Sequence, residues 1–200
     1  MTELWWWQAS DFTPDWCQAR RHWLRDPSDH AEGVLSQLVR RALLARRLGC
    51  APESLRFVVG DKGKPALASS TLQFSVTHSH GWHLCLLSDL PCGVDVEPWD
   101  RKLDRLLRPD VLKRFAEREA LADAAAFLRC WVMKEAWAKC LGVSVWQQLG
   151  EALMPDADGW RVPGMSSGYA KLPACVGWTL AGEASPPVLK HCTPELFTSA

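Results

Sequence analysis

The spacing of apolar residues in the first half of the chain predicts helices set among short strands. An aromatic-rich run over residues 4–8 is typical of a strand, and Ser10 and Pro14 follow it. We expect a basic amphipathic helix over about residues 15–25. A second helix, which Asp29 can cap, has apolar residues at helical spacing up to Gly49. Strands are predicted near residues 55–59, 72–76, 82–87 and 92–96, and we expect the last two to pair through the loop at 88–91.

In the second half, helical spacing returns and strand patterns follow it. We predict helices over about residues 109–125 and 126–141, the second of which stops at Gly142. Strands are predicted at residues 160–162, 169–172 and 176–181, with Pro and Gly between them. Each half of the chain thus contains both helices and strands, and the boundary between the halves falls between about residues 87 and 100. The sequence therefore predicts the α+β class, with an N-terminal part over 1–90 and a C-terminal part over 91–200.

Composition narrows the class of protein. The chain has 200 residues, of which 48% are hydrophobic, so it can bury a core. Its formal charge is zero, from 23 basic and 23 acidic residues, which argues against a general partner of nucleic acids or anionic membranes. Seven arginines lie between residues 20 and 47, and they either present positive charge to an anion or form a solvated helix face.

The cysteines and the N-terminus favour the cytoplasm. The eight cysteines include no Cys-x-x-Cys pair, and the first residues lack the basic region of a signal peptide. No apolar run reaches the roughly 18 residues that would cross a bilayer. We therefore expect reduced thiols, which serve mostly as small core residues.

Two acidic patterns carry the candidate chemistry. In a strand, Asp95 and Glu97 project to one face, where two like charges repel unless a cation lies between them. In a helix, Trp131, Glu135 and Lys139 form one row at spacings of four. Three carboxylates and a lysine suit Mg²⁺ on substrate phosphates. The alternatives are solvent-facing strand acids and an ordinary exposed helix pair.

Other polar residues lie at strand ends and turns. Thr77 and His78 are placed to donate hydrogen bonds to phosphate, and Lys64 adds a positive charge in a stiff turn before Pro65. His78, His80, His83 and Cys85 do not have zinc-finger spacing. No Gly-x-x-x-x-Gly-Lys-Ser/Thr sequence occurs, so this is not a P-loop enzyme. The twelve tryptophans leave open a third reading, a tryptophan-rich binding module without metal or nucleotide.

Taken in order, these motifs resemble a known family, the 4'-phosphopantetheinyl transferases, and within it the monomeric type that activates surfactin synthetase and similar assembly-line enzymes. The resemblance is firm over about residues 55–145. It rests on Gly63-Lys64-Pro65, Phe74-Ser75-Val76-Thr77-His78-Ser79, Gly93-Val94-Asp95-Val96-Glu97, Arg114-Phe115 with Glu119, and the segment Phe127-x-x-x-Trp131-x-x-Lys134-Glu135-Ala136-x-x-Lys139-x-x-Gly142.

The resemblance implies a fold and a reaction. The fold is a pair of pseudo-symmetric α+β subdomains in one chain, with coenzyme A bound in the cleft between them. The enzyme moves the phosphopantetheine arm of coenzyme A to a serine of an acyl or peptidyl carrier protein and releases adenosine 3',5'-bisphosphate. The implied roles are Mg²⁺ binding by Asp95, Glu97 and Glu135, catalysis by Glu135 and Lys139, and coenzyme A binding by Lys64, Pro65, Thr77, His78 and Lys139.

The chain departs from the family pattern at two places. Ser75 stands where an asparagine is usual, and an arginine of the long N-terminal helix, assigned to the 3'-phosphate, falls on Ala31. The main alternative is a non-catalytic homologue that binds coenzyme A or a carrier protein. We expect a cytoplasmic monomer that binds neither nucleic acid nor membrane, and whose basic, apolar stretch at 101–115 can meet an acidic carrier helix.

Overall fold

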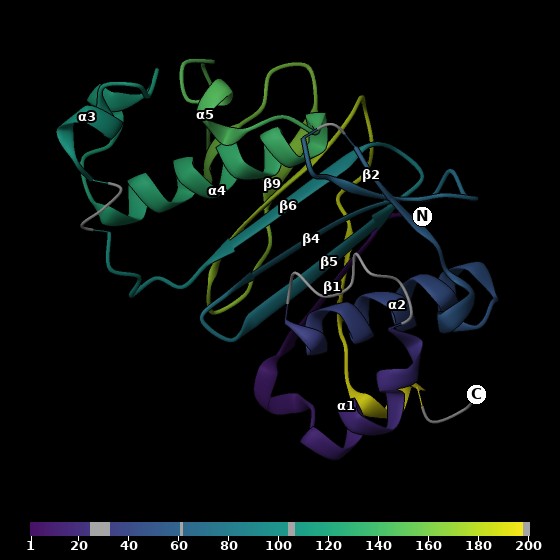
Figure 1. The fold of residues 1–200 in the computed structure, drawn as a ribbon. Helices are drawn as coiled ribbons and strands as arrows, with labels where there is room; N and C mark the ends of the chain where they lie inside the picture. The colour runs from purple at the N-terminus through teal and green to yellow at the C-terminus, as the bar shows by residue number, and fades with distance from the viewer. Residues whose placement is uncertain (25–32, 61, 104–106, 198–200) are drawn as a thin grey trace.

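The computed structural model describes residues 1–24, 33–60, 62–103 and 107–197 (Figure 1). Its N-terminal half consists of β1 (Glu3–Gln8), α1 (Pro14–Arg20), α2 (Val34–Leu48), β2 (Phe57–Val59), β3 (Pro65–Leu67), β4 (Gln73–Ser79) and β5 (Trp82–Ser88). Short 3₁₀ turns at Ala9–Asp11, Arg21–Trp23 and Pro52–Ser54 join these elements.

The second half begins with a strand and a short helix, β6 (Cys92–Glu97) and α3 (Pro109–Leu112). A 3₁₀ turn (Arg118–Ala120) leads to the long helix α4 (Ala124–Leu141), which α5 (Val145–Gln148) follows. The remaining strands are β7 (Met154–Asp156), β8 (Gly159–Arg161), β9 (Ser166–Tyr169), β10 (Cys175–Leu180) and β11 (Val188–His191), and a last 3₁₀ turn covers Pro194–Phe197.

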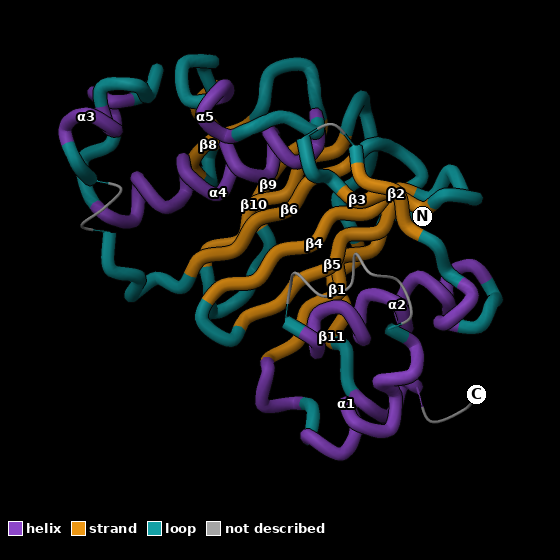
Figure 2. Tube along the Cα trace, viewed as in Figure 1, coloured by secondary structure: helices purple, strands orange, loops and turns teal. Residues whose placement is uncertain are grey.

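Two sheets form the centre of the molecule. One has the strand order β11-β1-β5-β4, and the other has the order β6-β10-β9. β6 and β4 run side by side, so the two sheets meet along these strands (Figure 2). Helix α2 covers the first sheet and helix α4 covers the second, and leucine and valine side chains fill the space between the sheets, among them Leu84, Leu86, Val94 and Val96. The mixed α and β content is what the sequence predicted.

Glycine allows α4 to lie against its sheet. A Cβ atom on Gly93 of β6 would come within 1.9 Å of the Ala136 carbonyl oxygen, and one on Gly177 of β10 within 2.9 Å of the Val132 carbonyl oxygen. Gly93 pairs with Thr179 of β10 in the antiparallel register of the two strands. Because α4 backbone occupies the space of those side chains, the helix packs closely over β6.

Two predictions about elements are wrong. Strands 82–87 and 92–96 do not pair with each other, since β5 pairs with β1 and β4 while β6 pairs with β10. A tight turn at His80 and Gly81, both with positive φ, joins β4 and β5 instead. The expected helix over 109–125 is also broken, because α3 ends at Leu112 and α4 begins only after Asp123, whose side chain accepts the Ala126 N–H.

Among the other predictions, some agree with the structure, some differ in their bounds and some lie outside the described residues. The strand expected at 169–172 lies earlier, as β9. α2 ends at Gly49 and α4 at Gly142, and both glycines adopt the left-handed conformation. The first helix is shorter than expected and ends at Arg20. The Asp29 cap and the alignment at Ala31 fall outside the described residues.

The end of the chain returns to the first sheet. β11 runs parallel to β1, and Leu196 and Phe197 pack against the core beneath α2. The division at residue 90 and the pseudo-symmetry stay predictions. Within the described residues, no helix is both long and apolar enough to cross a membrane.

Candidate active site

Hydroxyl groups of β4 hold the two carboxylates of β6. Thr77 Oγ1 donates to Asp95 Oδ1 at 2.8 Å, and Ser79 Oγ donates to Glu97 Oε2 at 2.7 Å. Both bonds join residues 18 positions apart, so the strands run in the same direction. Asp95 and Glu97 are 5% and 6% exposed. The seam between the sheets thus fixes two nearly buried carboxylates at defined positions.

Two cations lie against the same carboxylates. Lys139 Nζ of α4 is 2.7 Å from Asp95 Oδ1, and Arg101 forms an ion pair with Glu97 Oε1 four residues before it. The close approach of α4 to Gly93 places Lys139 beside β6. The repulsion expected between Asp95 and Glu97 is therefore offset by basic side chains.

Glu135 of α4 lies close enough to Asp95 for their charges to interact, and we call Asp95, Glu97 and Glu135 the acidic group. Burial and the neighbouring Asp95 carboxylate raise the pKa of Glu135, Lys139 and Arg101 lower it, and together they bring it to about 7. A carboxyl group with this pKa exchanges a proton near neutral pH, as a general base requires. Glu135 and Lys139 are four residues apart on α4 and therefore share one face of the helix, as the sequence predicted.

Carboxylate oxygens are the type of ligand that a hard divalent cation prefers. One of these oxygens also lacks a partner in the protein. Asp95 Oδ2 is buried without a hydrogen bond, although Oδ1 of the same group has two. An oxygen-only donor set with an unsatisfied buried atom fits Mg²⁺. Among the described side chains, however, no three His, Cys, Asp or Glu residues stand together as a preformed metal cluster.

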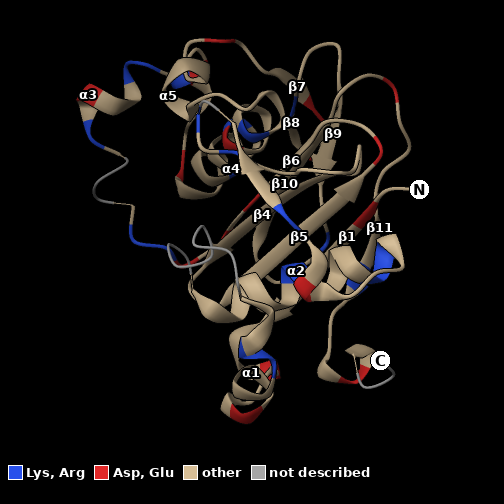
Figure 3. Ribbon diagram, turned by 45° about the vertical axis from the view of Figure 1, so that its right-hand side comes forward, with Lys and Arg blue, Asp and Glu red and all other residues tan. Residues whose placement is uncertain are grey.

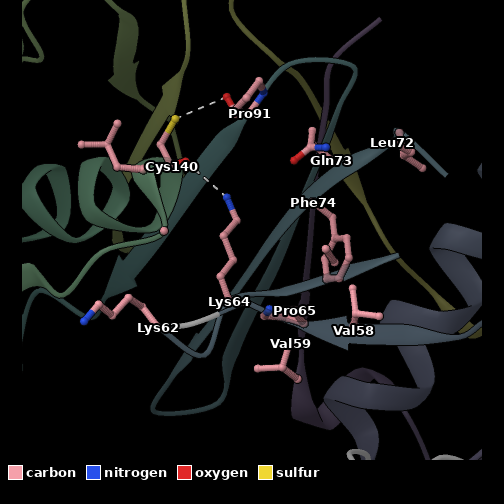
Figure 4. A pocket seen from close by; sticks show the side chains of 14 residues that line it. Val58, Val59, Lys62, Lys64, Pro65, Leu72, Gln73, Phe74, Pro91 and Cys140 are labelled. Carbon is pink, nitrogen blue, oxygen red and sulfur yellow. Dashed lines mark hydrogen bonds between the residues drawn. The ribbon is translucent and has the colours of Figure 1, made fainter. Parts of the chain in front are cut away.

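Lys64 and Pro65 border a cavity of about 460 Å³ at the seam (Figure 4). Lys64 Nζ donates to the carbonyl oxygens of Cys92 on β6 and Cys140 on α4, at 3.0 and 3.4 Å. Apolar side chains of β2 and β4 form part of the wall. A smaller cavity of about 200 Å³ also has Lys64 and Pro65 in its lining and reaches Lys139. The smaller cavity therefore places the Gly-Lys-Pro turn and Lys139, the partner of Asp95, in one lining.

His78 lies apart from the acidic group. It follows Thr77 on β4, so its side chain points to the other face of the strand, where its ring stacks on His83 with centroids 5.6 Å apart. His83 stacks in turn on Trp7, and burial together with the neighbouring His78 lowers the pKa of His83 to about 4. The structure therefore brings together Thr77, Asp95, Glu97, Glu135 and Lys139 but not His78.

The sequence reasoning missed one buried ion pair. Lys134 Nζ lies 3.0 Å from Glu117 Oε1, and both side chains are almost fully buried. Glu117 also accepts the Leu153 N–H at 2.6 Å. The sequence had drawn attention to Glu119, which is exposed. An apolar helix face with a lysine in it was the signal that a buried acid must lie nearby.

Comparisons with known proteins identify the family of the chain. The family model of the 4'-phosphopantetheinyl transferase superfamily matches residues 91–171. A 4'-phosphopantetheinyl transferase of Salmonella typhi is 37% identical over 131 residues, which are 61% of this chain and 67% of that protein. The Bacillus subtilis 4'-phosphopantetheinyl transferase is 27% identical over 122 residues, 54% of this chain and 51% of that protein.

A Synechocystis protein, whose name provisionally assigns it to the same transferases, is 31% identical over 148 residues. That match covers 69% of this chain and 60% of the Synechocystis protein. The chain thus spans between about half and two thirds of these relatives. The family match includes Asp95, Glu97, Glu135 and Lys139, and it ends before β10.

Proposed function

Since the chain belongs to the 4'-phosphopantetheinyl transferase superfamily, we propose that it transfers the 4'-phosphopantetheine arm of coenzyme A to a serine of an acyl or peptidyl carrier protein. The observation that supports this best is the juxtaposition of Asp95, Lys139 and Glu135, of which Lys139 also lines the smaller cavity that Lys64 and Pro65 border. The site comes from β4, β6 and α4 of one chain, as expected of an enzyme that acts as a monomer.

In this reaction the serine hydroxyl of the carrier attacks the phosphorus next to the pantetheine arm. Glu135 takes the serine proton in this proposal, and its pKa of about 7 applies to the site without metal. The new bond joins the serine oxygen to phosphorus. The bond from the same phosphorus to the bridging oxygen breaks, and adenosine 3',5'-bisphosphate leaves. Lys139 lies beside the acids and compensates the charge on the leaving phosphate.

Asp95, Glu97 and Glu135 are the residues that we assign to Mg²⁺, on the grounds of their oxygen donors and the unpartnered Asp95 Oδ2. When bound, the ion supplies positive charge to the phosphate oxygens. Thr77 and Ser79 keep two of the acids oriented. In this proposal Lys64 and Pro65 border the adenine. Thr77 and His78 contact phosphates, for which Thr77 has to turn its hydroxyl away from Asp95 and His78 has to be reached from the other face of β4.

The carrier protein approaches over a basic surface in this proposal. Basic residues follow the end of β6 and flank α3, where Figure 3 shows blue segments of the ribbon. Arg101, Arg108 and Arg114 belong to this stretch, and Arg114 lies over the ring of Trp146. Carrier proteins that present acidic helices suit this charge.

Mass spectrometry of an apo carrier, incubated with the protein, coenzyme A and Mg²⁺, tests the proposal. We expect a mass gain of one phosphopantetheine group on the carrier. Glu135→Gln and Lys139→Ala should each lower the rate about 100-fold or more, while Lys171→Ala, an exposed lysine away from the acids, should not. Stabilisation by coenzyme A without any holo product would favour the non-catalytic homologue.

A further inference from the structure

Basic side chains of the same chain, Arg101 and Lys139, pair with the carboxylates of the acidic group. Arg101 follows Glu97 by four residues, and its backbone N–H donates to the Pro98 carbonyl oxygen at 3.1 Å. This turn folds the chain back, so that the guanidinium meets Glu97 Oε1. Only about a quarter of the Arg101 side chain is exposed, and the Glu97 side chain is nearly buried.

The pair occupies atoms that a metal ion would need. Of the two Glu97 oxygens, Oε1 is taken by Arg101 and Oε2 accepts from Ser79. Asp95 differs, because its Oδ2 atom has no partner. A divalent cation thus finds an available oxygen on Asp95 but must compete for Glu97.

We propose that Arg101 is a displaceable counter-ion of the acidic group, which occupies Glu97 until a divalent cation takes its place. The inference rests on the cation site of the proposed function. It assigns Arg101 a positioning role: the guanidinium lowers the affinity of the acids for metal alone, and entry of the metal releases the turn from Pro98 to Arg101. Metal binding and the conformation of the basic segment after β6 are thereby coupled.

Calorimetric titration with Mn²⁺, without coenzyme A, measures this competition directly. Arg101→Gln should bind Mn²⁺ about five- to tenfold more tightly than the unmodified protein, the size expected when a partly exposed ion pair no longer competes. The matched control is Arg129→Gln, which removes an equal charge from α4, where the guanidinium lies over Trp99. We expect the control to change the affinity less than twofold.

Hydrogen exchange adds a readout of the release. Saturation with Mn²⁺ should increase amide exchange in a peptide covering residues 98–103 of the unmodified protein. In Arg101→Gln the exchange should already be fast and should not change with metal. Equal Mn²⁺ affinity of Arg101→Gln and the unmodified protein would overturn the inference, and so would an equal gain in both arginine variants, since long-range charge would then explain it.

The test separates this inference from the proposed function. If Arg101→Gln binds Mn²⁺ more tightly but the protein never modifies a carrier, the counter-ion inference holds and the transferase proposal fails. If the protein modifies carriers but Arg101→Gln leaves the Mn²⁺ affinity unchanged, the transferase proposal holds and the counter-ion inference fails. Absence of Mn²⁺ binding in every variant contradicts both the cation site and the counter-ion.

Discussion

At the residue scale, Glu135 links stability to pH. The pKa of Glu135 rises from 4.5 to about 7 in the fold, so the folded state holds a proton that the unfolded state has lost between these values. Stability contributed by this group therefore falls as pH rises through that window. Because Glu135 remains partly exposed, we expect the cost of ionising it in the fold to be about 2 kcal/mol.

Glu135→Gln should remove this cost. In the presence of a chelator, the variant is expected to be more stable than the unmodified protein by about 2 kcal/mol at pH 8 and nearly equal to it at pH 4.5. Urea unfolding at the two pH values measures the difference. A constant difference across this range would show that Glu135 titrates normally in the fold.

Periodicity made part of this site accessible from the sequence. Alternation in β6 and spacings of four in α4 predicted that Asp95 and Glu97, and separately Glu135 and Lys139, share faces. These are local relations, which a single element fixes. Arg101 was not identified, because its contact with Glu97 depends on the turn after Pro98 rather than on a regular element.

At the element scale, Gly93 controls the distance between β6 and α4. An alanine Cβ at this position would overlap the Ala136 carbonyl oxygen at 1.9 Å and approach the Cys140 nitrogen at 2.5 Å. Gly93→Ala should therefore cost about 3 kcal/mol or more, because backbone on both sides has to move. Gly150→Ala, where an added Cβ meets nothing within 4 Å, is the matched control.

Denaturant unfolding of both glycine variants checks this prediction, and calorimetric Mn²⁺ titration shows whether the acidic group is disturbed as well. We expect Gly93→Ala to lose Mn²⁺ affinity, since Lys139 and Glu135 move with the helix. Similar stability of the two variants would mean that α4 can shift on its sheet at little cost.

The buried pair Glu117 and Lys134 fixes the segments around α4. Lys134 Nζ also donates to the carbonyl oxygens of Leu149 and Glu151, so one ammonium group joins the helix to the chain before β7. Lys134→Met should destabilise the protein by about 3–5 kcal/mol, because Glu117 is left buried without its cation. Adding Glu117→Gln should recover part of this loss, measured by the same unfolding experiment. Additive effects would contradict a coupled pair.

Element boundaries show where sequence patterns stop being informative. α2 and α4 were predicted well, because each ends at a glycine with left-handed backbone. The region 109–125 has helical spacing but folds as a short helix and turns, since Phe115 is buried in the core and Glu117 is held by Lys134. Tertiary contacts of this kind override local preference.

At the scale of the whole molecule, the pairing of distant strands was beyond the sequence pattern. The sequence predicted that the strands of β5 and β6 pair with each other, yet each joins a different sheet. The alternation of apolar residues shows which face of a strand is buried but not which strand lies beside it, so pattern alone cannot choose the partner of a strand. The short β11 was not predicted, although it completes the edge of the first sheet.

The last prediction concerns this returning segment. β11 pairs with β1 in parallel, Lys190 forms an ion pair with Glu3, and the ring of His191 stacks on Trp6 with centroids 4.0 Å apart. Cys192, which follows, is fully buried beneath α2. Ending the chain at residue 187 removes all of these contacts and uncovers one edge of β1.

We expect that truncation to lower the melting temperature by at least about 8 °C, because several kcal/mol of burial and pairing are lost and each kcal/mol shifts a domain of this size by about 2–4 °C. A chain that ends at residue 197 keeps every described contact of the segment and serves as the control. Scanning calorimetry of the two proteins provides the measurement. Equal melting temperatures would show that the first sheet is complete without β11, and that the returning segment contributes little to the stability of the fold.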